Sequence, residues 1–153
     1  MKLATLCYLR KEGKTLMLYR NKKKNDINGG RWIGLGGKIM DGETPEECAI
    51  REIKEESGYI AKNLILKGIL TFPDFDGCQS WYVFLYLITE FEGQLIECTE
   101  GTLKWIDDNE LFNLNMWEGD KIFLRWLNEK GIYSAKFIYK NENFINYQFV
   151  KYD

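Results

Sequence analysis

The chain has 153 residues, of which 45% are hydrophobic and 29% are charged, and its formal net charge at pH 7 is -2. This length and composition predict one globular domain over residues 1–153 that is large enough to bury a hydrophobic core. The near-neutral charge excludes a general electrostatic attraction to nucleic acid, so we expect no stable nucleic-acid partner and only local phosphate binding.

The chain contains four cysteines and no histidine. The cysteines show no CxxC spacing and have no histidine partners, which is typical of reduced cytosolic thiols and favours neither a zinc site nor a disulfide framework. The apolar run after Lys2, residues 3–9, is too short for an export signal or a membrane span. The sequence therefore predicts a cytoplasmic protein without membrane attachment, and it excludes a histidine general base.

Strand and turn signals dominate the first third of the chain. Strands are predicted over residues 3–9 and 15–20, around a turn at Glu12 and Gly13, and over residues 33–35. A glycine-dense turn, residues 34–37, follows the third strand.

A helix is predicted to begin after Thr44. Thr44 is the expected N-cap, Pro45 occupies the first helical position, and Glu47 completes a capping box. Gly58 is the expected stop.

This helix has an acidic face. Because each residue advances about 100° around the axis, Glu52, Glu55 and Glu56 share one side. A neighbouring apolar stripe is predicted to pack on a sheet and consists of Ala49, Ile50 and Ile53. Three carboxylates on one face repel each other, so their retention favours a bound cation over the alternative, a solvated acidic face.

The rest of the chain is rich in strand signals. Strands are predicted over residues 64–72, 81–91, 103–106, 135–139 and 144–150, with a turn at residues 73–77 and a terminal hairpin around residues 141–143. A short helix capped by Asp107 or Asp108 and a second helix over residues 120–128 are also predicted. Interleaved strands and helices indicate an α/β fold with a mixed sheet between helices.

The segment GKIMDGETPEECAIREIKEESGY, residues 37–59, resembles the Nudix box, G-x5-E-x7-R-E-U-x-E-E-x-G-U, where U is a bulky aliphatic residue. The residues in register are Gly37, Glu43, Arg51, Glu52, Ile53, Glu55, Glu56 and Gly58, and the departure is Tyr59 at the last position. The resemblance implies a Nudix-type α/β/α sandwich with a mixed β-sheet. It also implies hydrolysis of a nucleoside diphosphate linked to another moiety.

The same resemblance implies a metal site. Its ligands would be Glu52, Glu55 and Glu56, assisted by a backbone carbonyl of Gly36 or Gly37. Mg²⁺, with Mn²⁺ as the alternative, prefers such oxygen ligands and sits between carboxylates and substrate phosphates. Glycine has no Cβ and lets metal and phosphate approach the backbone closely.

Two carboxylates are candidates for the general base, since no histidine is present. Glu55 is the first candidate. Glu100 is the second candidate and a further metal ligand, because some family members bring a carboxylate to the metal from a loop in this region; the alternative is a plain loop acid. Arg51 is predicted to hold the acidic face, with Glu43 as its partner across the turn that leads into the helix.

Basic residues surround the glycine turn and are candidates for phosphate binding. They are Arg20, Lys22, Lys23, Lys24, Arg31 and Lys38. A solvated turn is the alternative, and we expect it to hold for at least one of the lysines.

Flanking segments resemble the branch of the family that hydrolyses oxidised purine nucleoside triphosphates, the 8-oxo-dGTP diphosphatases. They are residues 30–32, 71–73 and 116–120. The resemblance implies Trp117 as a stacking residue and Asp120 as a reader of the base edge. Phe72, Phe75 and Trp81 are candidate pocket walls, with ordinary core packing as the alternative.

Two positions depart from that branch. Gly119 replaces one of two adjacent acids, and Ile33 stands where some members carry an asparagine that contacts the base. Other substrates therefore stay open, including ADP-ribose, a dinucleoside polyphosphate or an RNA 5′ end. A non-catalytic nucleotide sensor and an isoprenoid-type isomerase are further alternatives; the intact acidic set disfavours the sensor. The oligomeric state is not determined by the sequence.

Overall fold

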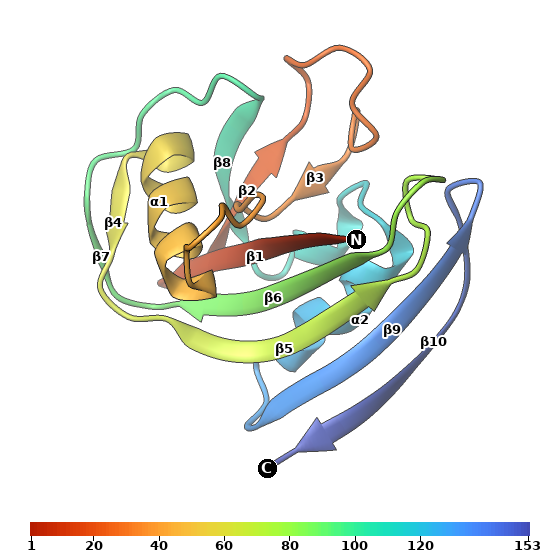
Figure 1. The fold of residues 1–153 in the computed structure, drawn as a ribbon. Coiled ribbons are helices and arrows are strands. Elements are labelled where there is room, and N and C mark those ends of the chain that lie inside the picture. Colours follow the sequence, from red (N-terminus) through yellow and green to blue (C-terminus); the bar gives the residue numbers. More distant parts are fainter.

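The computed structural model describes residues 1–153 and has an α/β architecture (Figure 1). The strands are β1 (Lys2–Lys11), β2 (Lys14–Tyr19), β3 (Trp32–Ile33), β4 (Tyr59–Ala61), β5 (Ile65–Phe72), β6 (Trp81–Ile88), β7 (Phe91–Gly93), β8 (Thr102–Asp107), β9 (Ile132–Lys140) and β10 (Asn143–Tyr152). The helices are α1 (Pro45–Ser57) and α2 (Glu118–Trp126), with a 3₁₀ turn at Leu111–Asn113. Neither α1 nor α2 is long and apolar enough to cross a membrane.

The main sheet is mixed, as predicted. Its strand order is β10-β9-β5-β6-β1-β2-β3, and β8 also pairs with β2. The β1–β6 and β5–β9 pairs are parallel, whereas the other pairs are antiparallel. Strands β4 and β7 form a separate two-stranded sheet.

Two hydrophobic clusters lie on opposite faces of the main sheet. Along β6, Leu85 belongs to the cluster that contains Phe123 of α2, and Tyr86 belongs to the cluster that contains Ile53 of α1. Successive strand residues point to opposite faces, so the sheet is packed between the two helices (Figure 1). Each large apolar side chain buried in this way contributes about 1.5–3 kcal/mol to folding. The predicted α/β/α sandwich is confirmed.

The ends of α1 follow the predicted capping. Thr44 Oγ1 accepts a hydrogen bond from the Glu47 backbone at 3.0 Å, and the Glu47 carboxylate accepts one from the Thr44 backbone at 2.9 Å. Gly58 ends the helix with φ 84°. The prediction for Ile50 is wrong: its side chain is 39% exposed, because position 50 is turned away from the narrow stripe of Ala49 and Ile53 that faces the sheet.

Three other elements differ from the sequence prediction. The strand expected over residues 81–91 is interrupted where Asn63 Oδ1 accepts hydrogen bonds from the backbones of Thr89 and Glu90, and the chain then pairs with the unpredicted β4. The short helix before Phe112 is only a 3₁₀ turn; Asp108 accepts a hydrogen bond from Thr15 Oγ1 instead of capping a helix. The short strand predicted over residues 33–35 is observed as β3 plus an isolated bridge at Leu35.

Candidate active site

The glycine turn runs alongside β1 and brings its backbone to α1. The Thr5 backbone donates to the Gly37 carbonyl at 2.9 Å, and Cys7 exchanges backbone hydrogen bonds with Leu35. Gly36 has φ 138°, and a Cβ at this position would lie 2.1 Å from the Thr5 carbonyl oxygen. Only glycine allows this close approach of turn and strand.

Two of the α1 carboxylates face this turn. Glu56 accepts a hydrogen bond from the Gly36 backbone at 2.8 Å, and a Cβ at Gly37 would lie 2.6 Å from the carboxylate carbon of Glu52. Glu56 is buried, and this burial raises its pKa to about 9, with added repulsion from Glu52 and Glu100. Burial also raises the pKa of Glu52, partly offset by Arg51. The site thus concentrates carboxylates that disfavour one another's charge.

Arg51 links the acids to the loop before the helix. Its guanidinium donates to Glu43 at 2.6 and 2.9 Å, to Glu52 at 2.6 Å and to the Lys38 carbonyl at 3.2 Å. Hydrogen bonds from Arg51 hold the pKa of Glu43 at about 2. The predicted Glu43–Arg51 pair is confirmed, and Arg51 joins Glu43 to Glu52.

The three carboxylates predicted as metal ligands do not all converge in the structure, because Glu55 does not join Glu52 and Glu56 at the glycine turn. The side chain of Glu55 is 59% exposed and lies 3.5 Å from Arg51, and no three acidic or thiol side chains are grouped as a metal site. The donors themselves fit Mg²⁺, because they are carboxylate oxygens beside a glycine backbone that a Cβ would obstruct. The metal-binding role of Glu52, Glu55 and Glu56 stays a prediction.

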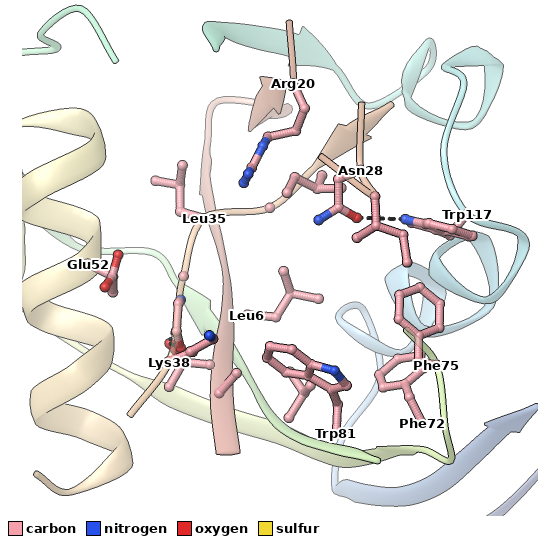
Figure 2. Close-up of a pocket in the computed structure, with 18 of the residues that line it drawn as sticks. Leu6, Arg20, Asn28, Leu35, Lys38, Glu52, Phe72, Phe75, Trp81 and Trp117 are labelled. Atoms are coloured by element: carbon pink, nitrogen blue, oxygen red, sulfur yellow. Dashed lines mark hydrogen bonds between the residues drawn. The ribbon is translucent and has the colours of Figure 1, made fainter. Parts of the chain in front are cut away.

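A cavity of about 670 Å³ extends from this acidic face to an aromatic pocket. The residues at its acidic end are Gly36, Gly37, Glu52, Glu100, Arg20, Lys23 and Lys38. The aromatic end is lined by Phe72, Phe75, Trp81 and Trp117, with Asn28 beside them (Figure 2). Tyr139, which meets Trp117 edge-to-face, and Asp120 also line the cavity. The volume suits a small organic ligand, and its two ends differ sharply in polarity.

The basic residues near the acidic end have different roles. Arg20 is paired with Asp26 at 2.7 Å and with Glu100 at 3.4 Å, while Lys23 and Lys38 line the cavity without an ion-pair partner. Lys22 donates to the Cys98 carbonyl and to Glu97. Lys22 and the exposed Lys24 do not line the cavity, as expected for at least one lysine of this loop.

Trp117 is a buried wall of the aromatic end. The Arg31 guanidinium lies 3.7 Å from the centre of the indole and covers one face, while Phe75 and Tyr139 meet the ring edge-to-face. Arg31 is not among the residues that line the cavity; it donates to the Ile27 carbonyl at 3.0 Å. Arg31 therefore supports the indole, and stacking on Trp117 is restricted to the surface that Arg31 leaves free.

Asp120 lies in the first turn of α2 and faces the cavity. It is buried, and its carboxyl group makes no hydrogen bond within the protein. Burial raises the pKa of Asp120 to about 8, and Arg31 offsets this only partly. The raised pKa favours the protonated form at neutral pH, and this form offers both a donor and an acceptor to a ligand.

Among the cavity residues that the sequence prediction missed are Asn28, Asp76 and Tyr139. Asp76 accepts a hydrogen bond from Trp81 Nε1 at 3.0 Å, and the Tyr139 hydroxyl accepts one from the Gly119 backbone at 2.7 Å. Asp76 was assigned only to the turn at residues 73–77, and Asn28 was assigned to no element. Tyr139 was assigned only to the terminal hairpin.

Comparison with known proteins gives a consistent picture. A family model described as NUDIX domain matches residues 1–127. An uncharacterized Nudix hydrolase of Bacillus subtilis is 34% identical over 90% of the chain and 87% of its own length. An oxidized purine nucleoside triphosphate hydrolase of Danio rerio is 28% identical over 94% and 90%, and an ADP-ribose pyrophosphatase of Methanocaldococcus jannaschii is 34% identical over 78% and 71%.

A solved structure has the same fold over nearly the whole chain. The crystal structure of a Mutator MutT protein from Bacillus halodurans superposes with a TM-score of 0.87, and the two sequences are 30% identical. The match covers 97% of each chain, including β9 and β10 beyond the residues that the family model matches.

Proposed function

The chain belongs to the NUDIX family, and from this premise we propose that it hydrolyses oxidised purine nucleoside triphosphates, such as 8-oxo-dGTP, to the monophosphate and pyrophosphate. The observation that carries the proposal is the single cavity that joins the acidic face of α1 to an aromatic pocket containing the buried carboxyl group of Asp120. In a cell this activity would remove mutagenic nucleotides from the precursor pool.

The aromatic end suits a purine base. Phe72, Phe75 and Trp81 provide apolar and π surface, and the neutral Asp120 can donate a hydrogen bond to the base edge and accept another. Asp120 has no protein partner, so a polar base edge would satisfy it.

The acidic end suits a polyphosphate held with a divalent cation. Glu52, Glu55 and Glu56 would hold Mg²⁺ with Glu100 and a carbonyl of the glycine turn, and the ion would neutralise phosphate charge and acidify a water. Lys23 and Lys38 line the same part of the cavity and attract the phosphates. Arg51 keeps Glu52 in place through its 2.6 Å hydrogen bond.

The proton of the attacking water needs an acceptor. Glu100 lines the cavity, whereas Glu55 does not. This placement favours Glu100 as the general base and reverses the order expected from the sequence. If Glu100 is the general base and Glu55 only holds the cation, Glu100→Gln should lower kcat more than Glu55→Gln does.

The experiment that tests the proposal is a turnover panel in Mg²⁺, with 8-oxo-dGTP, 2-hydroxy-dATP, dGTP, ADP-ribose and diadenosine tetraphosphate compared by kcat/KM. The proposal predicts the highest value for an oxidised purine triphosphate, with pyrophosphate as a product. Best turnover of another class would reject this substrate while leaving hydrolysis at the same acidic site.

ADP-ribose hydrolysis is the second candidate. The observation that favours it is the 34% identity to an ADP-ribose pyrophosphatase, which exceeds the identity to the purine triphosphate hydrolase of Danio rerio. ADP-ribose yields two monophosphates and no pyrophosphate, so product analysis separates the two functions.

A further inference from the structure

Asn28 presents a fixed hydrogen-bond donor to the aromatic end of the cavity. Its Oδ1 accepts a hydrogen bond from Trp117 Nε1 at 2.8 Å (Figure 2). An indole N–H can only donate, so its partner must be the carboxamide oxygen, and the orientation of the amide follows from chemistry. The Nδ2 group is left without a hydrogen bond in a side chain that lines the cavity.

The loop holds Asn28 rigidly on both sides. Its backbone N–H donates to Asp26 Oδ1 at 3.1 Å, and its carbonyl accepts from the Arg31 backbone at 3.0 Å. Asp26 is in turn held by Arg20 at 2.7 Å. The unpaired Nδ2 group is therefore preorganised, and a ligand that uses it loses little conformational entropy.

We propose that Asn28 is a specificity-determining residue whose Nδ2 donates a hydrogen bond to a carbonyl oxygen of the bound purine. The inference rests on the proposed function, because it assumes that the aromatic end holds a base. The donor is supplied by the β2–β3 loop, whereas Asp120 reaches the same cavity from α2.

The chemistry of the group explains the selectivity. An N–H donor aimed at a carbonyl oxygen forms a hydrogen bond, whereas the same donor aimed at an amino group leaves two donors opposed and unpaired. Sites built to hydrogen-bond one group reject analogues that lack it far better than apolar pockets do. Purine carbonyls occur at C6 in guanine and at C8 in 8-oxopurines, and unmodified adenine has neither.

The test is calorimetric binding of 8-oxo-dGMP, dGMP, 8-oxo-dAMP and dAMP without metal. Asn28→Asp keeps the acceptor for Trp117 and the side-chain shape but replaces the donor with an oxygen. Asn28→Ala removes the donor without adding charge. Asn115→Asp is the matched control: Asn115 Nδ2 donates to the Gly30 carbonyl at 2.7 Å in the same loop, but the side chain does not line the cavity.

The expected result is a rise in Kd of about tenfold or more for carbonyl-bearing nucleotides relative to dAMP in both Asn28 variants, and no such change in the control. Loss confined to 8-oxo-dGMP and dGMP assigns the C6 carbonyl, and loss confined to the two 8-oxo nucleotides assigns the C8 carbonyl. An equal loss for dAMP, no loss, or the same selectivity change in Asn115→Asp would overturn the inference.

If the monophosphates bind too weakly to measure, kcat/KM ratios for the corresponding triphosphates serve the same comparison. If nucleotide binding depends on Asn28 but the wild-type protein hydrolyses none of the triphosphates, the proposed function is refuted and this inference still stands. Circular dichroism of both Asn28 variants checks that a loss does not arise from unfolding.

Discussion

The carboxyl group of Asp120 lines the cavity without a hydrogen-bond partner in the protein. Native proteins rarely leave a buried polar group unsatisfied unless a ligand or water completes it. Its pKa of about 8 follows from burial, which disfavours the charged form. The carboxyl group is therefore available to a ligand that enters the cavity.

Because the pKa of Asp120 is raised, the free energy of unfolding should depend on pH. Its folded pKa of about 8 exceeds the ordinary value of 3.8, so the folded protein retains a proton that the unfolded chain releases between these values. The stabilising contribution is complete below pH 3.8 and is lost as the pH rises through about 8. Asp120→Asn should therefore gain stability relative to wild type between about pH 6 and pH 9 in urea unfolding. An equal difference at both pH values would contradict the assignment.

Replacement of Glu56 by glutamine changes a single atom of the acidic face. Glu56→Gln keeps the acceptor for the Gly36 backbone, and because the pKa of Glu56 is about 9, the amide resembles the neutral acid at pH 7. We expect the free energy of unfolding to change by less than about 1 kcal/mol, while kcat falls by about 100-fold or more. Steady-state kinetics and urea unfolding measure the two effects.

Glu97→Gln is the matched control, since this nearby loop acid is 90% exposed and pairs only with Lys22. It should leave kcat unchanged. Retained turnover in Glu56→Gln would remove Glu56 from the metal site.

Among residues, the sequence predicted best those whose role depends on local spacing. Glu43 and Arg51 were paired correctly because helix and turn geometry fix their separation. Asn28 was missed because its orientation depends on Trp117, which is distant in sequence. Arg31 was placed at the substrate, but in the structure it packs on the indole, a contact no local pattern encodes.

At the scale of elements, the junction of the glycine turn with β1 and α1 positions the acids. Gly36 and Gly37 are adjacent, yet they face different neighbours. A Cβ at Gly36 would meet the Thr5 backbone, whereas a Cβ at Gly37 would meet the Glu52 side chain. Gly36 therefore affects the stability of the junction, whereas Gly37 affects the position of the Glu52 side chain.

Substitution of each glycine by alanine should give different outcomes. Gly36→Ala should destabilise the protein by more than about 1 kcal/mol, because both its φ of 138° and the Thr5 carbonyl oppose a side chain. Gly37→Ala should cost less stability but lower kcat, because the flexible Glu52 must move away. Thermal unfolding and kinetics distinguish them, and similar stability losses in both variants would refute the distinction.

Element prediction succeeded where the signal was local and failed where it was not. The cap residues of α1 fixed both of its ends, whereas Ile50 was misplaced because apolar character alone does not define the buried stripe. The β4–β7 pair was missed because each strand has only three residues, and Asn63 creates the break that separates β7 from β6.

At the scale of the molecule, interleaved strands and helices predicted a mixed sheet between helices, but not the cavity. The cavity depends on how β1, β5, β6, α2 and the β2–β3 loop meet, which involves contacts between distant parts of the chain. Most of the candidate site residues were predicted from the resemblance to a family. The local sequence alone supplied the acidic helix face and the adjoining turn.

Removal of divalent cations should stop turnover without unfolding the protein. α1 is held to the sheet by Ala49 and Ile53, so its packing does not require a bound ion. EDTA should abolish activity and Mg²⁺ should restore it, while Mg²⁺ raises the Tm of wild type more than that of Glu56→Gln. Loss of secondary structure in EDTA, measured by circular dichroism, would contradict the prediction that the fold does not require a bound cation.

We propose that the cavity recognises an oxidised purine base while the acidic face of α1 supports hydrolysis of its polyphosphate. The ratio of kcat/KM for 8-oxo-dGTP to that for dGTP, measured in Mg²⁺ by pyrophosphate release, tests it most directly. We expect a ratio well above one that decreases when Asp120 is replaced by alanine. A ratio of one in wild type, or a ratio that Asp120→Ala leaves unchanged, would contradict it.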